Sequence, residues 1–572
     1  WIFSWTYFLI RRYWKLISGI LFSIIVIWFF LFNGFAQCYF WWLDARDYFK
    51  PSSFKPEFLT SSGRMSLLNL QLPVDKEKSQ TYEEKANEKW KFYQDLKKDG
   101  MKKFNEKNYQ ESLNVFDELI KDADTIIKKY TKPNSLDQDY LPVDKQAFLD
   151  VAKEALRDPE VWLFRNNAKV YENTSDGSSF TIAVVVPSND AAGRHILQGV
   201  ALAQNEAIDR GVYLNVIIAD DKNNDTNNKD DKDTMQPSEV IAKHLSENPK
   251  VLAVVGHYAS SSTCPALRFY TRKFIPVISP SSTVYGLRSQ CFDFNKVFFR
   301  TVTSTKNEAS ELSDYLKNES SLSNNPHIYI YYQEKDKFSF SLFEQFKEAL
   351  NNISNDQNTS KTFDLSKAFD MDKTTLDNSQ IDDADGLAIF SGAGSNGLNK
   401  AKKIIELSIK HKSKNNIPIV GSNTLYFANL FDELNEDERK NLYKRFVIAV
   451  DWHPDIDGEE VKNFKKSINS LIHGEANFRT ALAYESTSLL VDILNKSEQK
   501  VTRRYIKNEL EKMVGSESKR SKVSSSSLGF DSNTGDQNQF SKSLVTPALQ
   551  SNKSGIRFCI LEKCKASSAE NS

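Results

Sequence analysis

The chain has 572 residues, and its 75 Lys and Arg residues balance 75 Asp and Glu residues, so the formal net charge is zero. This balance gives no global basic field for nucleic-acid binding, and only a local patch could serve that purpose. Five cysteines are too few for a disulfide scaffold, and the length predicts one large domain with smaller pieces.

An uncharged stretch lies near the start of the chain. Residues Leu16–Ala36 form 21 positions without a charge, and a helix of that length spans roughly 30 Å, the hydrocarbon thickness of a bilayer. Basic residues in 11–15 precede it, which places the N-terminus in the cytoplasm by the positive-inside rule. We expect 1–42 to be a single-pass anchor in the inner (plasma) membrane, with the C-terminal domain in the periplasm or extracytoplasmic space. A cleaved signal peptide is the alternative, because Gly34–Ala36 offers small residues where a peptidase cuts.

A linker and a helical segment follow the apolar stretch. Residues 43–80 are mixed and contain prolines, which predicts a linker. In 81–175, dense Lys and Glu with a helical apolar spacing predict helices, with a turn near Lys107-Asn108. This segment resembles a tetratricopeptide repeat at four positions, Gly100, Tyr109, Ser112 and Phe116. A helical hairpin that acts as a spacer and a docking surface for a partner both fit the pattern.

From residue 176 to 567, short apolar runs alternate with amphipathic segments. The runs predict buried strands at 180–186, 213–219, 251–255, 275–279, 327–332, 386–390 and 417–420. The segments between them predict helices at 193–210, 237–247, 261–273, 338–350 and 397–411. Such alternation is typical of βαβ units and parallel sheets, so we expect an α/β fold. About 390 residues exceed one hydrophobic core, which predicts two lobes.

Two hydroxyl-rich loops follow neighbouring predicted strands. Gly256–Thr263 follows the strand at 251–255 and opens a helix, and Ile278–Thr283 follows the next strand. Ligands of parallel sheets bind beyond the carboxyl ends of the strands, so both loops belong at a binding edge. Their hydroxyls and the free N–H groups of a helix start form a neutral cradle for an anion such as a carboxylate.

These loops carry a resemblance to a known family. Val255–Thr263, Ile278–Thr283 and Phe299–Thr301 resemble the branched-chain amino acid (Leu/Ile/Val) family of type I periplasmic binding proteins. The tetratricopeptide-like preface joined to such a domain is similar to cyanobacterial members. The resemblance implies two lobes joined by three crossovers, which close by a hinge motion around a ligand. The implied lobes are 180–304 with 452–510, and 305–451 with 515–567.

The resemblance also implies residue roles in the first lobe. Ser260 and Thr283, with the backbone at Ser281, are expected to grip the carboxylate of a small ligand. Tyr258 is expected to line the same wall.

In the second lobe the chain departs from the family pattern. Family members that bind amino acids place an acid where this chain has Thr305 and another near Asn423, and Phe338 falls near a family tyrosine. Without those acids, a ligand ammonium would be buried with no counter-charge, at a cost of several kcal/mol. We therefore expect Thr305, Phe338 and Asn423 to contact a hydroxylated, amide or anionic ligand.

Other motifs carry less chemistry. Gly392–Gly397 matches G-x-G-x-x-G, but no acid ends the next strand, so we interpret it as a tight turn at the cleft rim rather than a nucleotide site. The acidic loop 220–233 has Lys232 where a calcium loop needs its bidentate acid. No zinc-protease motif, paired C-x-x-C or nucleophile elbow occurs. We expect no enzyme activity, no metal and no cofactor.

His257 and the cysteines receive structural interpretations. We expect His257 to orient the first hydroxyl loop rather than to act in catalysis. Cys264 could pair with Cys291, and Cys559 with Cys564, but sequence alone leaves the connectivity open.

Together these patterns predict an extracytoplasmic solute-binding protein. The first hypothesis is a component that captures an amino acid or a related small polar or anionic solute and delivers it to an ABC permease. The alternative is a membrane-anchored ligand sensor that signals through a partner protein.

Overall fold

The computed structural model describes residues 52–564 except 53, 71, 73–78, 132–141, 175–177, 189, 222–233, 358, 378, 380, 412–415, 427–430, 432–433, 444, 475, 498–499, 514–518, 538–541 and 549–556. The predicted anchor and most of the acidic loop lie outside these residues. No helix in the described part of the chain is long and apolar enough to cross a membrane. The chain divides into two compact units, and the first is Trp1–Lys55 with Thr226–Gln236. Every helix and strand below belongs to the second unit.

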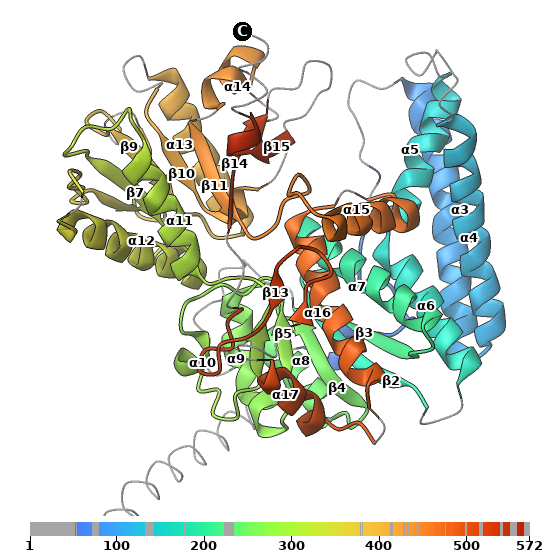
Figure 1. The fold of residues 1–572 in the computed structure, drawn as a ribbon. Coiled ribbons are helices and arrows are strands. Elements are labelled where there is room, and N and C mark those ends of the chain that lie inside the picture. The colour runs from blue at the N-terminus through green and yellow to red at the C-terminus, as the bar shows by residue number, and fades with distance from the viewer. Residues whose placement is uncertain are drawn as a thin grey trace, which may run out of the picture. The chain divides into compact units, whose positions relative to one another are not determined.

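The first sheet has six strands in the order β1-β3-β2-β4-β5-β6 (Figure 1). They are β1 (Thr60–Ser61), β2 (Phe180–Val186), β3 (Leu214–Asp220), β4 (Val251–Gly256), β5 (Val277–Ser279) and β6 (Phe298–Arg300). Strands β2 to β6 pair in parallel, as expected for continuous Val and Ile runs that are buried on both faces. β1 pairs antiparallel with β3 at the edge.

Helices pack around this sheet to form the first lobe. They are α7 (Ala191–Asp209), α8 (Pro237–Glu247), α9 (Ser260–Arg272), α10 (Leu287–Gln290), α15 (Glu459–Ile472), α16 (Phe478–Asn495) and α17 (Arg503–Lys512). α7 lies along α16, and Gly199 permits this contact because a Cβ there would come within 2.2 Å of the Thr480 carbonyl oxygen. The short strands β12 (Lys519–Arg520) and β13 (Ser527–Leu528) pair with each other.

The second sheet has seven strands in the order β15-β14-β11-β10-β9-β7-β8. They are β7 (Ile328–Tyr332), β8 (Ala368–Asp370), β9 (Gly386–Ile389), β10 (Ile419–Gly421), β11 (Phe446–Val450), β14 (Ser543–Ala548) and β15 (Arg557–Ile560). The helices of this second lobe are α11 (Thr305–Asn318), α12 (Lys337–Asn355), α13 (Ser395–Lys410), α14 (Glu436–Leu442) and the 3-10 turn η3 (Asn423–Leu425). Alternate residues of β7 face opposite sides. Ile330 joins the apolar core that contains Phe346 of α12, and Tyr331 joins the one that contains Ile404 of α13.

Both sheets share one strand order. β3-β2-β4-β5-β6 in the first lobe and β8-β7-β9-β10-β11 in the second each follow the doubly wound order 2-1-3-4-5. The direction of winding therefore reverses between β2 and β4, and again between β7 and β9. This architecture confirms the predicted two-lobed α/β fold.

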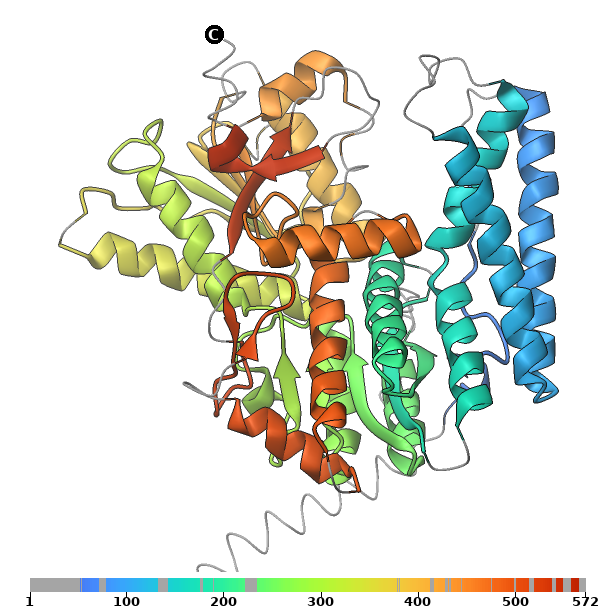
Figure 2. The same ribbon diagram turned by 45° about the vertical axis from the view of Figure 1, so that its right-hand side comes forward.

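Four helices precede the first lobe, α3 (Gln80–Asn105), α4 (Tyr109–Tyr130), α5 (Val143–Arg157) and α6 (Pro159–Asn173), with α6 between α4 and α7 (Figure 2). α6 also packs on β3. The Asn167 side chain donates to the Val216 carbonyl at 2.8 Å and accepts from the Val216 N–H at 2.9 Å, like a neighbouring strand. The helical segment is thus attached to the edge of the first sheet.

The structure departs from the predicted limits at two places. Part of the expected linker 43–80 forms β1 at the edge of the first sheet. The sequence did not indicate this strand, because two residues have no periodicity to detect. Residues 519–537, expected in the second lobe, pack on the first. The Arg300 N–H donates to the Gly535 carbonyl at 3.1 Å, and the Phe530 ring lies 5.2 Å from that of Phe299. This Ser-rich stretch lacks an apolar pattern, so the third crossover comes later than predicted, just before β14.

Candidate functional site

The loops at the two reversal points carry the candidate ligand site. In the first lobe, Asp190 follows β2 and Tyr258 follows β4, and in the second lobe Asp336 follows β7. The carboxylates of Asp190 and Asp336 both act electrostatically on the Tyr258 phenol, so the loops of the two lobes meet here. Ligands of doubly wound sheets bind at such reversal points.

A buried arginine faces Tyr258. Arg479 lies in the first turn of α16, is 3% exposed and hydrogen bonds the Tyr258 side chain. Its guanidinium lies 4.4 Å from the ring centroid of Phe478. Asn477 caps the helix, because its side-chain oxygen accepts from the N–H groups of Arg479 at 3.0 Å and Thr480 at 3.1 Å. Burial raises the pKa of the Tyr258 phenol, and the charge of Arg479 opposes that rise.

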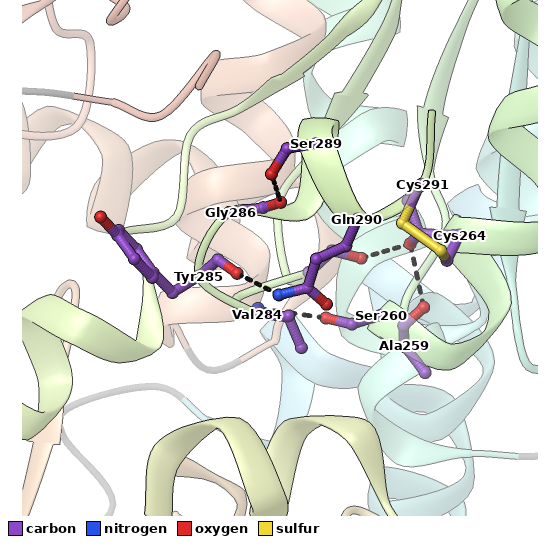
Figure 3. Close-up of a disulfide and its surroundings, with 11 residues drawn as sticks. Ala259, Ser260, Cys264, Val284, Tyr285, Gly286, Ser289, Gln290 and Cys291 are labelled. Carbon is purple, nitrogen blue, oxygen red and sulfur yellow. Dashed lines mark hydrogen bonds between the residues drawn. A yellow bond between two sulfur atoms is a disulfide. The ribbon is translucent and has the colours of Figure 1, made fainter. Parts of the chain in front are cut away.

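The two predicted hydroxyl loops lie together beside this pair. Ser260 begins α9, and its Oγ accepts a hydrogen bond from the Val284 N–H at 3.3 Å (Figure 3). Ser281 Oγ donates to the Tyr258 carbonyl at 2.9 Å. Thr283 is buried, and its carbonyl accepts from the Thr305 N–H at 2.7 Å. The structure therefore brings the four first-lobe residues together, and their contact with a ligand stays a prediction.

Both ring nitrogens of His257 make contacts that hold the first hydroxyl loop. Its Nδ1 lies 2.8 Å from Asp221 Oδ2, and its Nε2 lies 3.1 Å from the hydroxyl of Tyr270. Gly256 before it has a φ of +128°, and a Cβ there would come within 2.3 Å of the Val185 carbonyl oxygen. This geometry agrees with the orienting role expected for His257.

A disulfide ties the C-terminal end of α10 to α9. Cys264 and Cys291 are joined, with their Cα atoms 5.0 Å apart, and Figure 3 shows this bridge beside Ser260. Cys559 and Cys564 form the second bridge, which lies in the second lobe.

The three predicted second-lobe residues do not gather around one point. Thr305 is fully buried, lies 2.8 Å from the Ser341 hydroxyl and accepts from the Tyr285 N–H at 3.1 Å, both through Oγ1. Phe338 packs against the apolar core of the second lobe. Asn423 lies at the carboxyl end of β10 and donates to Glu308 from its backbone and side chain, each at 2.8 Å. Asn423 therefore lies at the binding edge of the second sheet, whereas Thr305 bonds Thr283 of the first lobe.

The glycine motif makes room for side chains rather than phosphates. A Cβ at Gly392 would come within 2.6 Å of Asp336 Oδ2, and one at Gly397 within 2.3 Å of Gln333 Oε1. The Gly392 N–H donates to Gln333 Oε1 at 2.9 Å. The motif therefore admits Asp336 to the edge of the second sheet.

Sequence reasoning missed Arg479, Asp190 and Asp336. The available signal for Arg479 was a single basic residue at the start of the largely apolar stretch 478–494. For the two aspartates it was an N-cap residue in the loop that follows a strand. Asp190 accepts from the Ala192 N–H at 2.8 Å, and Asp336 from the Ser339 N–H at 2.8 Å.

Comparison with known proteins gives a consistent family and fold. Residues 187–527 match the family described as periplasmic binding protein. An ABC transporter substrate-binding protein from Desulfitobacterium hafniense in complex with Leu is 18% identical, with 67% of this chain and 100% of that chain covered and a TM-score of 0.50. The branched-chain amino acid transporter substrate binding protein LivJ from Streptococcus pneumoniae in complex with isoleucine is also 18% identical, with 66% and 98% covered and a TM-score of 0.50. A solute binding protein from R. palustris in complex with 4-hydroxybenzoate is 13% identical, with 66% and 95% covered and a TM-score of 0.52. No curated protein matches the chain.

Proposed function

This chain belongs to the periplasmic binding protein family, and from that membership we propose that it captures a small carboxylate-bearing solute between its two lobes for ABC-type uptake. One observation carries the proposal. The buried Arg479 hydrogen bonds Tyr258 at the reversal point of the first sheet, beside the hydroxyls of Ser260 and Ser281. A guanidinium fork and nearby hydroxyls match the planar geometry of a carboxylate.

The surrounding acids widen the class of solute to amino acids. Asp336 and Asp190 lie near the same phenol, so they provide the counter-charge for an ammonium that Thr305 and Asn423 do not. The solved neighbours support a carboxylate, because their bound leucine, isoleucine and 4-hydroxybenzoate all carry one. An uncharged solute would provide no negative charge to pair with the Arg479 guanidinium.

Thermal unfolding with a panel of compounds tests the proposal. The panel contains L-leucine, L-isoleucine, 4-hydroxybenzoate and the amide of each. A ligand at about 1,000 times its dissociation constant adds about 4 kcal/mol of stability, which raises the unfolding midpoint visibly. We expect a rise with at least one carboxylate. A rise with the amides alone would contradict the proposed solute class.

The remaining features of the proposal concern location and partners. We infer a binding protein rather than an enzyme, in keeping with the family that residues 187–527 match. The membrane anchor at 1–42, the extracytoplasmic location, the domain limits, the tetratricopeptide likeness and the similarity to cyanobacterial members stay predictions. An ABC permease is the proposed partner.

One contact favours the sensor alternative. Arg194, in the first turn of α7 beside the candidate site, pairs with Glu154 of α5 at 2.5 Å. Movement of that turn on ligand binding would therefore reach the helical segment. Affinity purification from membranes separates the two functions, because recovery of permease subunits supports uptake and recovery of a signalling protein without them supports sensing.

A further inference from the structure

Two crossovers between the lobes meet at a buried ion pair. Asp451 directly follows β11, and Lys542 directly precedes β14. These strands pair antiparallel with Val450 opposite Ser543, so Asp451 and Lys542 lie opposite each other where both strands leave the second sheet. Lys542 Nζ lies 2.8 Å from Asp451 Oδ2, and both side chains are fully buried.

The first crossover joins the same carboxylate. Thr303 lies between β6 and α11, and its N–H donates to Asp451 Oδ1 at 2.8 Å. Thr303 is fully buried as well. One carboxylate therefore links all three chain segments that connect the lobes.

Glu308 extends this cluster to the binding edge of the second sheet. Its side chain, in the first turn of α11, is fully buried and lies 3.5 Å from Lys542 Nζ. Its two oxygens accept from the backbone N–H and the side-chain amide of Asn423, each at 2.8 Å. Within the described part of the chain, the Asn423 side chain makes no other hydrogen bond. Glu308 thus holds the side chain of a residue expected to contact the ligand, while the Tyr426 N–H donates to its backbone carbonyl.

We propose that Glu308 is a positioning residue for ligand binding, which acts through Asn423 and couples the ligand-facing edge of the second lobe to the three crossovers. This inference rests on the proposed function, since Asn423 matters to a ligand only if the ligand binds at this edge. A lobe that closes on a ligand must move relative to these crossovers, and the buried cluster resists such movement unless its members stay paired.

The charge state of Glu308 makes the coupling depend on pH. Burial raises the pKa of Glu308 to about 7, Lys542 and the Asn423 N–H oppose the rise, and Asp451 adds to it. Glu311, farther along α11, also has a pKa raised by burial and also senses Lys542. Above this pKa the carboxylate accepts both Asn423 hydrogen bonds, and below it one oxygen carries a proton. The hold on Asn423 is therefore strongest on the alkaline side of neutrality.

A ligand-free double-mutant cycle tests the coupling on the full-length protein. Glu308→Gln, Asn423→Ala and the double variant are unfolded at about pH 8 and about pH 6, on either side of the Glu308 pKa. At the higher pH we expect the unfolding equilibrium constants to show coupling between Glu308 and Asn423. At the lower pH we expect this coupling factor to be about tenfold smaller. Additive effects at the higher pH would overturn the proposal, whether or not any solute is known.

Ligand titrations with L-leucine, L-isoleucine and 4-hydroxybenzoate form the second arm. For any of these that binds, we expect affinity to fall as the pH drops through about 7 and this dependence to vanish in Glu308→Gln. Glu485→Gln is the matched control, because Glu485 is also buried with a raised pKa but accepts from Ser521 and Lys522. An unchanged pH profile in Glu308→Gln would overturn the inference. If none of the three binds, the proposed solute class fails and the cycle alone decides the role of Glu308.

Discussion

The Oγ of Ser260 accepts a hydrogen bond from the backbone N–H of Val284 at 3.3 Å. This contact joins the loop after β4 to the loop after β5, which places two hydroxyl-rich segments at one sheet edge. Arg479 and Tyr258 lie at the same edge. A carboxylate held there would meet hydroxyl donors, a phenol and a guanidinium together.

Removal of two hydroxyls from these loops should weaken ligand binding. Ser260→Ala with Thr283→Ala is expected to cost about 2 kcal/mol of binding free energy, because each hydroxyl is expected to donate to the ligand carboxylate. Calorimetric titration of the double variant measures this cost. Ser289→Ala is the control, since Ser289 lies in the nearby helix α10, is exposed and donates to the Gly286 carbonyl. Equal affinity in the double variant and the control would reject the proposed carboxylate grip.

Arg479 should contribute more than either hydroxyl. Arg479→Gln is expected to weaken binding of a carboxylate by about 10- to 100-fold, because a hydrogen bond to a charged partner is lost. The affinity of Arg479→Lys should lie between those of the wild type and Arg479→Gln, because a lysine keeps the charge but lacks the planar fork. The comparison variant is Arg504→Gln on α17, since the Arg504 guanidinium lies 3.8 Å from the ring centroid of Phe274, which follows α9. Wild-type affinity in Arg479→Gln would remove Arg479 from the site.

The helical segment should depend on Asn167 for its attachment. Asn167→Ala leaves the N–H and carbonyl of Val216 unpaired at the β3 edge, so we expect a loss of about 2–4 kcal/mol of unfolding free energy. Denaturant unfolding measures it. Asn173→Ala is the matched control on the same helix, because Asn173 is exposed and donates to the Lys169 carbonyl. Similar stability of the two variants would show that the attachment lies elsewhere.

Acid should destabilise the protein through His195. Burial, together with the charges of Arg479, Arg194 and Arg157, lowers the pKa of His195 to about 3. The unfolded chain takes up this proton near pH 6.5 and the folded chain does not, so stability falls as the pH drops below about 6.5. His195→Gln should flatten this dependence, measured as unfolding free energy against pH.

The control for that measurement is His411→Gln. His411 lies 2.9 Å from Asp382 at the surface of the second lobe. A pH profile that is equally flattened by both changes would contradict the special role of His195.

The sequence predicted the repeated elements well because their periodicity is local. The bounds of β2 and α8 agree with the predicted segments at 180–186 and 237–247. The predicted strands did not include β1, β6, β8, β11, β14 and β15. β1 and β8 have only two and three residues, which carry no period to detect.

The site was predictable only where a motif marks it. Tyr258, Ser260 and Ser281 lie in loops whose hydroxyl content is visible in the sequence. Glu308 and Asn423 pair across 115 positions, and no local pattern reports such a contact. The absence of acids at Thr305 and Asn423 therefore suggested a site without counter-charge, whereas folding brings Asp336 to the same edge.

A paired calorimetric titration tests the central claim most directly. The wild-type protein is titrated with L-leucine and L-leucinamide, and then with 4-hydroxybenzoate and 4-hydroxybenzamide, which differ in the carboxylate alone. We predict that a carboxylate binds and that its amide binds at least about tenfold more weakly, the value of one hydrogen bond to a charged group. An amide that binds as tightly as its carboxylate would contradict the account.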